Sequence, residues 1–167
     1  LHPRDIATLP SPSLKREAQS LTETAERKQT AIVYGFPGVS RNDPDRAPLV
    51  VLQNIVTGLG GRFFEAIREK QGLAYAVQTR NVFLSKAGAT FTYTAFSPEN
   101  EEKVRASLEA EIERLRNQGV TAEEVRRAVA YSVGEYAIGL QTHQDKVLDL
   151  ARGIYSGEGA GSQQKFV

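Results

Sequence analysis

The chain has 167 residues and a net charge of +1, with 40% hydrophobic and 25% charged residues. These values predict one globular domain with a sizeable core, and they give no electrostatic reason to expect nucleic acid or an acidic membrane surface as a partner. Cysteine is absent, which excludes disulfides and cysteine-ligated zinc, and no 18-residue apolar run predicts a membrane span.

The domain organisation follows from composition. Residues 1–29 begin with a segment rich in proline and serine and continue with charged residues, so we expect a linker or connector. Residues 30–157 carry the α+β pattern, and residues 158–167 are expected to be a flexible tail or the start of a truncated element. No methionine stands at position 1, which suggests a piece of a longer polypeptide.

The first elements are a strand and a helix. Residues 30–36, TAIVYGF, are β-rich and apolar, and Pro37 with Gly38 ends the strand. Asp43 followed by Pro44 is typical of a helix start, and Gly58 is the expected end of that helix. Apolar residues nearly encircle it, which predicts deep burial.

A helix, a glycine reversal and a strand follow within the stretch 59–84. Phe63, Phe64 and Ile67 form an apolar stripe at helical spacing, and Gly72 is placed as a C-terminal cap. Beyond it, apolar and polar positions alternate as in a strand, with Tyr75 on the same side as Val77.

Residues 89–96, ATFTYTAF, predict a third strand that forms a hairpin with the second and is half-buried. Three helices are then expected. The first follows Ser97-Pro98 and ends at Gly119, the second begins at the capping box of Thr121, and the third begins at Thr142. The third helix is expected to bury one side, formed by Val147, Leu148, Ala151 and Ile154.

Strands do not alternate strictly with helices, so a doubly wound parallel fold is not expected. The order favours an α+β fold with an antiparallel or mixed sheet and helices packed on one face. Three strands make a narrow sheet for so many helices, and a missing last strand beyond Val167 would explain the imbalance.

No complete catalytic motif is present. The two histidines, His2 and His143, lie far apart in the sequence and have no partner at zinc-binding spacing. There is no P-loop, no dinucleotide fingerprint after a strand and no G-x-S-x-G elbow. We therefore predict neither a metal site nor a cofactor in this chain.

One pair of residues remains as a candidate site. Arg68 in the last helical turn and Tyr75 early in the next strand lie on either side of Gly72, so their polar ends can emerge at one corner. A guanidinium and a neutral hydroxyl can together hold a peptide carbonyl and stabilise an oxyanion. The alternative is structural: Arg68 as a cation at a helix C-terminus, and Tyr75 as a half-buried strand residue.

The same stretch carries a family resemblance. LGGRFF from Leu59 to Phe64 and IREKQGLAY from Ile67 to Tyr75 resemble the C-terminal, non-catalytic half of the pitrilysin/insulinase family of inverted-zincin metallopeptidases, which includes mitochondrial processing peptidase. By order of elements the resemblance extends over roughly residues 30–155. Gly60-Gly61 replaces the family's common Ser-Ser, a variant similar to that of long bacterial members.

The resemblance implies that two similar halves enclose a chamber and have different roles in the reaction. The N-terminal half carries H-x-x-E-H and binds zinc, whereas this chain lacks that motif and would be inactive alone. Arg68 and Tyr75 match the arginine and tyrosine with which the C-terminal half reaches the substrate. The expected partners are a catalytic half-domain, a peptide substrate and a second copy of the fragment.

Two interpretations stay open at this level. The chain is either the substrate-binding half of a zinc metalloendopeptidase or a scaffolding half without a catalytic role. The compartment, bacterial cytoplasm or periplasm, and the peptide specificity are not determined by the sequence.

Overall fold

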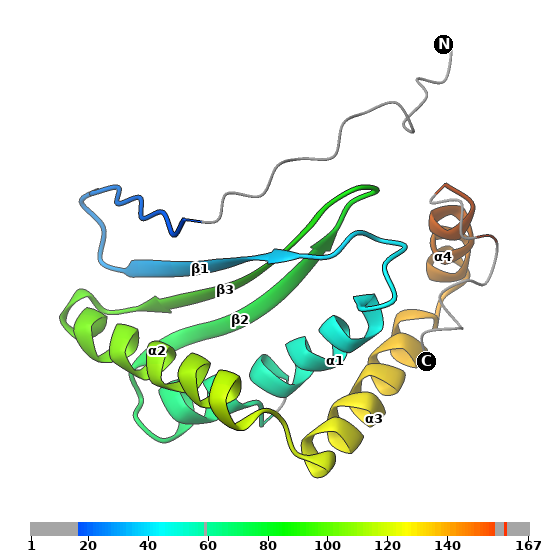
Figure 1. Ribbon diagram of the computed structural model, residues 1–167. Helices are drawn as coiled ribbons and strands as arrows, with labels where there is room; N and C mark the ends of the chain where they lie inside the picture. Colours follow the sequence, from blue (N-terminus) through cyan, green and yellow to red (C-terminus); the bar gives the residue numbers. More distant parts are fainter. Residues whose placement is uncertain (1–16, 59, 156–158, 160–167) are drawn as a thin grey trace.

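The computed structural model describes residues 17–58, 60–155 and 159 (Figure 1). Its strands are β1 (Thr30–Gly38), β2 (Ala74–Phe83) and β3 (Gly88–Phe96). Its α-helices are α1 (Arg46–Thr57), α2 (Glu101–Gln118), α3 (Ala122–Gly139) and α4 (His143–Tyr155), and two short helices are η2 (Phe64–Glu69) and η3 (Pro98–Asn100). The described residues before β1 contain no helix or strand, and the predicted tail, apart from Gly159, lies outside the described residues.

The three strands form one antiparallel sheet in the order β1-β3-β2. A short turn joins β2 to β3, as the hairpin prediction required, while β1 reaches the other side of β3 from far away in the chain. The α+β class with an antiparallel sheet is therefore confirmed, and β1 and β2 are the two edges of the described sheet.

The core lies between the sheet and the helices that cover one of its faces. Figure 1 shows α1 along β2 and α2 across the other end of the sheet. The predicted stripe of α2 supplies Val104 and Leu108, both fully buried, and η2 supplies Phe63 just before its start and Ile67 within it. Phe96 at the end of β3 joins the same cluster, so α2, η2 and the end of the sheet share one core.

The side of the sheet that faces the helices is the threonine side of β3. Thr92 and Thr94 are buried, whereas Tyr93 is 38% exposed on the opposite face. The buried hydroxyls of Thr79 and Thr92 hydrogen-bond each other across the strands at 2.8 Å, which satisfies both groups. The strand is half-buried as predicted, and the side that carries Tyr93 is the more exposed one.

Several helix ends confirm the sequence prediction. Gly72 and Gly119 have φ values of 62° and 68°, where a side chain is disfavoured. Thr121 and Glu124 form a complete capping box, and Thr142 makes reciprocal hydrogen bonds with Asp145. The start of α1 differs: Asp43 Oδ1 accepts from the Asp45 N–H at 2.9 Å in a turn, and the helix begins two residues after Pro44.

Two burial predictions are wrong. Only the last turn of α1, Asn54 to Val56, is buried rather than the whole helix. The predicted inner side of α4 is exposed, with Val147 at 63% and Ile154 at 66%, because α4 lies beyond the far end of α3 and not on the sheet (Figure 1). Periodicity shows which side of a helix is apolar, and it does not show whether another element covers that side.

A charged clamp fixes the corner between α2 and α3. Arg62 Nε and Nη2 donate to the two carboxylate oxygens of Glu124 at 2.5 and 2.7 Å, and Nη2 also donates to the Gly119 carbonyl at 2.9 Å. Hydrogen bonds from Arg62 are the main reason that the pKa of Glu124 falls to about 2. The clamp ties Arg62, two residues before η2, to the start of α3 and so holds the segment that carries Arg68.

Candidate functional site

Arg68 lies on a short helix with a widened turn. The segment Phe64–Glu69 is a π-helix, shown by the hydrogen bond from the Lys70 N–H to the Glu65 carbonyl at 2.9 Å. Such turns are rare and occur frequently at functional sites. The Arg68 guanidinium lies 5.2 Å from the centre of the Phe64 ring, a cation–π contact that supports the exposed side chain.

Tyr75 is the extra residue of a β-bulge. Ala74 pairs with Phe96 and Ala76 pairs with the adjacent Ala95, so no β3 residue lies opposite Tyr75. The bulge breaks the alternation that the sequence predicted: Ala74 and Val77 are buried, while Tyr75 is 55% exposed. Bulges commonly redirect a side chain beside an active site, and here the bulge turns the phenol out of the core.

The Tyr75 hydroxyl has a partner that the sequence interpretation missed. Tyr75 Oη and Ser97 Oγ lie 2.5 Å apart, and either oxygen can donate. Ser97 was predicted to cap the following helix, and it does stand at that position, but its side chain makes no capping hydrogen bond. The sequence contains only an indirect signal for this contact. Ala74 pairs with Phe96, and Tyr75 and Ser97 are the next residues along the chain.

The structure brings Arg68 and Tyr75 to one surface pocket of about 310 Å³. The remaining described lining residues come from the end of α1, from η2, from β2 and from α3: Thr57, Gly58, Phe64, Ala76, Val77, Gln78 and Tyr131. The pocket therefore offers one cation, hydroxyl groups and aromatic side chains from three elements, η2, β2 and α3. This set suits a polar main chain better than a metal ion.

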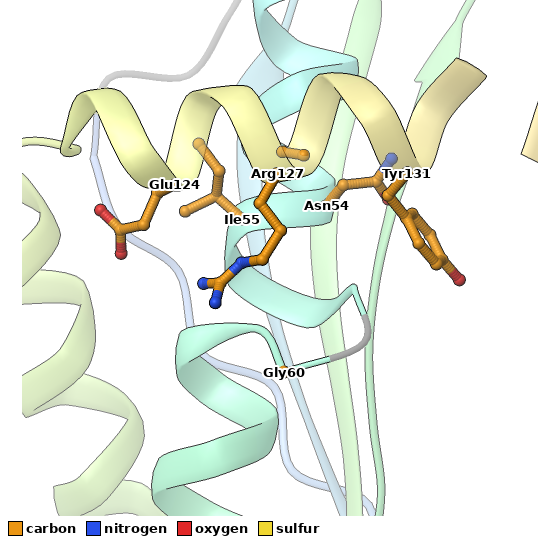
Figure 2. A pocket seen from close by; sticks show the side chains of 7 residues that line it. Asn54, Ile55, Gly60, Glu124, Arg127 and Tyr131 are labelled. Atoms are coloured by element: carbon orange, nitrogen blue, oxygen red, sulfur yellow. The ribbon is translucent and has the colours of Figure 1, made fainter. Parts of the chain in front are cut away.

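A second pocket lies between the end of α1 and α3. Figure 2 shows Arg127 and Tyr131 extending from α3, with Glu124 at one end of the pocket and Gly60 below them. Glu124 is already bound by Arg62, and Asn54, which also lines the pocket, donates to Ser132 Oγ at 2.8 Å. These groups serve packing between the helices. Tyr131 lines both pockets and links this one to the Arg68–Tyr75 pocket.

Within the described part of the chain, no group of three or more histidine, cysteine, aspartate or glutamate residues could hold a metal ion. His143 begins α4, and His2 lies outside the described residues. No described helix combines the length and apolar character needed to cross a bilayer.

Comparison with known proteins gives the family. Residues 3–131 match the family described as "Peptidase M16 inactive domain". The chain is 35% identical over 122 residues to an uncharacterized zinc protease of Rickettsia bellii, covering 72% of this chain and 28% of that protein. It is 30% identical over 115 residues to an uncharacterized zinc protease of Streptomyces coelicolor, covering 68% of this chain and 25% of that protein.

Solved structures agree in fold. A peptidase M16 inactive domain from Pseudomonas fluorescens superposes with a TM-score of 0.70 at 24% identity, covering 84% of this chain and 33% of that one. The inactive peptidase domain of a zinc protease from Bordetella parapertussis gives a TM-score of 0.67 at 19% identity, covering 82% and 75%.

The match over most of the chain defines a non-catalytic peptidase domain of α+β fold. The chain belongs to the peptidase M16 inactive-domain family, and the resemblance found in the sequence is confirmed. It spans about a quarter to a third of the length of the curated relatives that it matches.

Proposed function

We propose that this domain is the substrate-binding half of a zinc metalloendopeptidase, in which Arg68 and Tyr75 support the reaction from the side opposite the metal. The observation that carries the proposal is that a π-helix and a β-bulge, two irregular elements, present these two residues to the same pocket. Irregular backbone costs stability, and it is concentrated where function requires a particular side-chain direction.

The chemistry of the pair fits acyl transfer. When water attacks a peptide carbonyl, negative charge develops on the carbonyl oxygen, and preorganised donors lower the free energy of that transition state. The Arg68 guanidinium carries a permanent positive charge, and the Tyr75 hydroxyl donates without a charge of its own. Neither group can activate water at neutral pH, so the metal and the general base must come from elsewhere.

The source of the metal and the general base is a zinc-bearing catalytic half-domain, either in the same polypeptide or in a separate subunit. The zinc protease names of the relatives support this assignment. Bound zinc would polarise the carbonyl and lower the pKa of its water, while this chain holds and orients the peptide.

The test is turnover of a peptide by the assembled peptidase. Tyr75→Phe removes one donor, and Arg68→Ala removes the cation, so each is expected to lower kcat about 100-fold while zinc content, measured by mass spectrometry, stays at the wild-type value. Arg80→Ala is the matched control, because Arg80 is an exposed β2 residue that does not line the pocket. Its turnover is expected to stay within about twofold of wild type.

Unchanged turnover in both pocket variants would contradict the proposal and favour the second candidate, a scaffolding half. The exposed apolar side chains of α3 and α4, such as Val129 and Ile154, are the observation that favours an interaction role. The scaffolding interpretation also predicts that the partner half lacks H-x-x-E-H. Association of the isolated chain with a second copy, which light scattering would detect, is compatible with either candidate.

A further inference from the structure

A second arginine, Arg127, extends from α3 into the pocket of about 300 Å³ that adjoins the Arg68–Tyr75 pocket (Figure 2). Arg127 is exposed, and no hydrogen bond or ion pair joins it to another residue in the part of the chain that the structure describes. Tyr131, one turn further along α3, lines both pockets. A permanent positive charge therefore stands beside the candidate site without a counter-ion.

The two carboxylates at helical spacing from Arg127 are already engaged. Glu123 pairs with Arg126 on the surface, and both carboxylate oxygens of Glu124 accept hydrogen bonds from Arg62. The other arginines of α2 and α3 each pair with a carboxylate three or four residues earlier in their helix: Arg105, Arg114, Arg116 and Arg126. The free guanidinium is thus particular to position 127 and is not a general feature of these helices.

The other acids near Arg127 do not neutralise the pocket. Glu65 interacts with Arg127 through space, but its carboxylate is paired with Lys70 at 2.9 Å. Glu135 hydrogen-bonds Tyr131 and lines neither pocket. Among the described lining residues, the pocket has one acid, Glu124, whose charge is met by Arg62, so the charge that it offers to a ligand is positive.

The rest of the lining is suited to an aliphatic chain. Ile55 and Ala128 are only 5% and 3% exposed and give the pocket an apolar surface, and Tyr131 adds an aromatic ring. Gly60 leaves room, since a side chain there would meet no atom within 4 Å. A ligand with a short aliphatic stem and a terminal carboxylate matches this combination, because the stem can pack on apolar surface while the carboxylate reaches the guanidinium.

We propose that Arg127 binds a carboxylate of the peptide substrate and so selects acidic peptides. The carboxylate comes from an aspartate or glutamate side chain or from the C-terminus of the peptide, and the guanidinium donates charge-assisted hydrogen bonds to it. Because Arg127 lines the adjoining pocket and not the one that contains Arg68 and Tyr75, it acts on affinity and not on the reacting carbonyl. This inference rests on the proposed function for the ligand class, a peptide.

Binding of three peptides to this chain tests the proposal. Each is an N-acetylated nine-residue peptide of alanine and threonine with one tryptophan, whose fluorescence anisotropy is free of background because the chain has no tryptophan. The first has a central glutamate and an amidated C-terminus, the second has glutamine and the amide, and the third has glutamine and a free C-terminal carboxylate. At low salt, the first or the third is expected to bind about fivefold more tightly than the neutral second, and the one that does so identifies the source of the carboxylate.

Substitutions at two neighbouring arginines assign the preference to one side chain. Arg127→Ala is expected to reduce the fivefold preference to less than about 1.5-fold, and Arg127→Lys should keep part of it because the charge remains. Arg126→Ala is the matched control, since Arg126 lies on the same helix, pairs with Glu123 and lines neither pocket. The control should keep the full preference, and circular dichroism checks that each variant is folded.

Turnover by the assembled peptidase separates this role from that of Arg68 and Tyr75. With glutamate placed at each position of the substrate in turn, Arg127→Ala should raise KM about fivefold for at least one position and keep kcat within about twofold. The Arg68 and Tyr75 variants are instead expected to lower kcat for every peptide. The binding preference does not depend on turnover, so failure of the proposed function would leave it standing, and the reverse also holds.

Three outcomes would overturn the proposal. They are no binding of any of the three peptides at millimolar concentration, equal affinity of the wild-type chain for all three, and a preference for the carboxylate that Arg127→Ala leaves intact.

Discussion

The clamp between Arg62 and Glu124 makes a quantitative prediction about stability. Both side chains are mostly buried, with 10% and 15% of their surfaces exposed, and the pKa of Glu124 is lowered from 4.5 to about 2. A lowering of this size corresponds to roughly 3 kcal/mol of preference for the ionised form in the folded state. Screening by solvent at the edge of the pair reduces the expected contribution to roughly 2 kcal/mol.

Glu124→Gln keeps the shape of the side chain and removes the charge, so it is expected to lower the free energy of unfolding by about 2 kcal/mol at pH 7. Urea denaturation followed by circular dichroism measures this value. Glu123→Gln is the matched control, since Glu123 is the neighbouring carboxylate on α3 and pairs with Arg126 on the surface. The control is expected to change stability by less than about 0.5 kcal/mol.

The sign of the pH dependence follows from the lowered pKa. Folding favours the deprotonated form, so the contribution is fully present above pH 4.5 and is lost as the pH falls from 4.5 toward 2. The difference between wild type and Glu124→Gln should therefore shrink to less than half at pH 3. A difference that stays constant from pH 7 to pH 3, or a loss no larger than that of Glu123→Gln, would refute the electrostatic account.

Two further substitutions test the turn and the sheet. Gly72→Ala meets no neighbouring atom but must adopt a φ of 62°, so a loss of about 1 kcal/mol is expected in urea denaturation, with no change in the packing reported by near-ultraviolet circular dichroism. Thr79→Val leaves the buried Thr92 hydroxyl without its partner and should cost about 1–2 kcal/mol. Adding Thr92→Val should recover part of that loss, and additive losses in the double variant would contradict the role of the paired hydroxyls.

Much of the fold could be predicted from local signals. The stripe of α2 that contains Val104 and Leu108 is the buried stripe, and the glycines at 72 and 119 end their helices with positive φ values. The capping box of Thr121 also forms as predicted. For the two glycines and the capping box, the residue type and its spacing determine the outcome within about one turn of chain, so no knowledge of the tertiary structure is needed.

The positions of the two candidate residues were predicted only in part. The sequence places Arg68 and Tyr75 near one corner, and the structure confirms that they line one pocket. The sequence could not show the bulge at Tyr75. A bulge adds one residue to a strand and so reverses which face the following side chains point to, but it leaves no mark in the alternation of residue types. The contact with Ser97 depends on that bulge and was missed for the same reason.

Burial of the later helices could not be predicted for a different reason. The apolar side of α4 is present in the sequence, but Val147 and Ile154 are left largely exposed by the described residues. A periodic pattern shows which side of a helix is apolar. Whether another element covers that side depends on the whole tertiary structure.

Two side chains of α1 cover part of the β2 edge, which bears on how the chain avoids aggregation. An edge strand with a continuous row of free backbone groups is a template for uncontrolled pairing with other chains. Here Thr57 Oγ1 and Gln53 Oε1 accept hydrogen bonds from the N–H groups of Thr79 and Asn81, and the bulge at Tyr75 distorts the start of the strand. These interruptions shorten the continuous row of backbone groups that the β2 edge can offer to another chain.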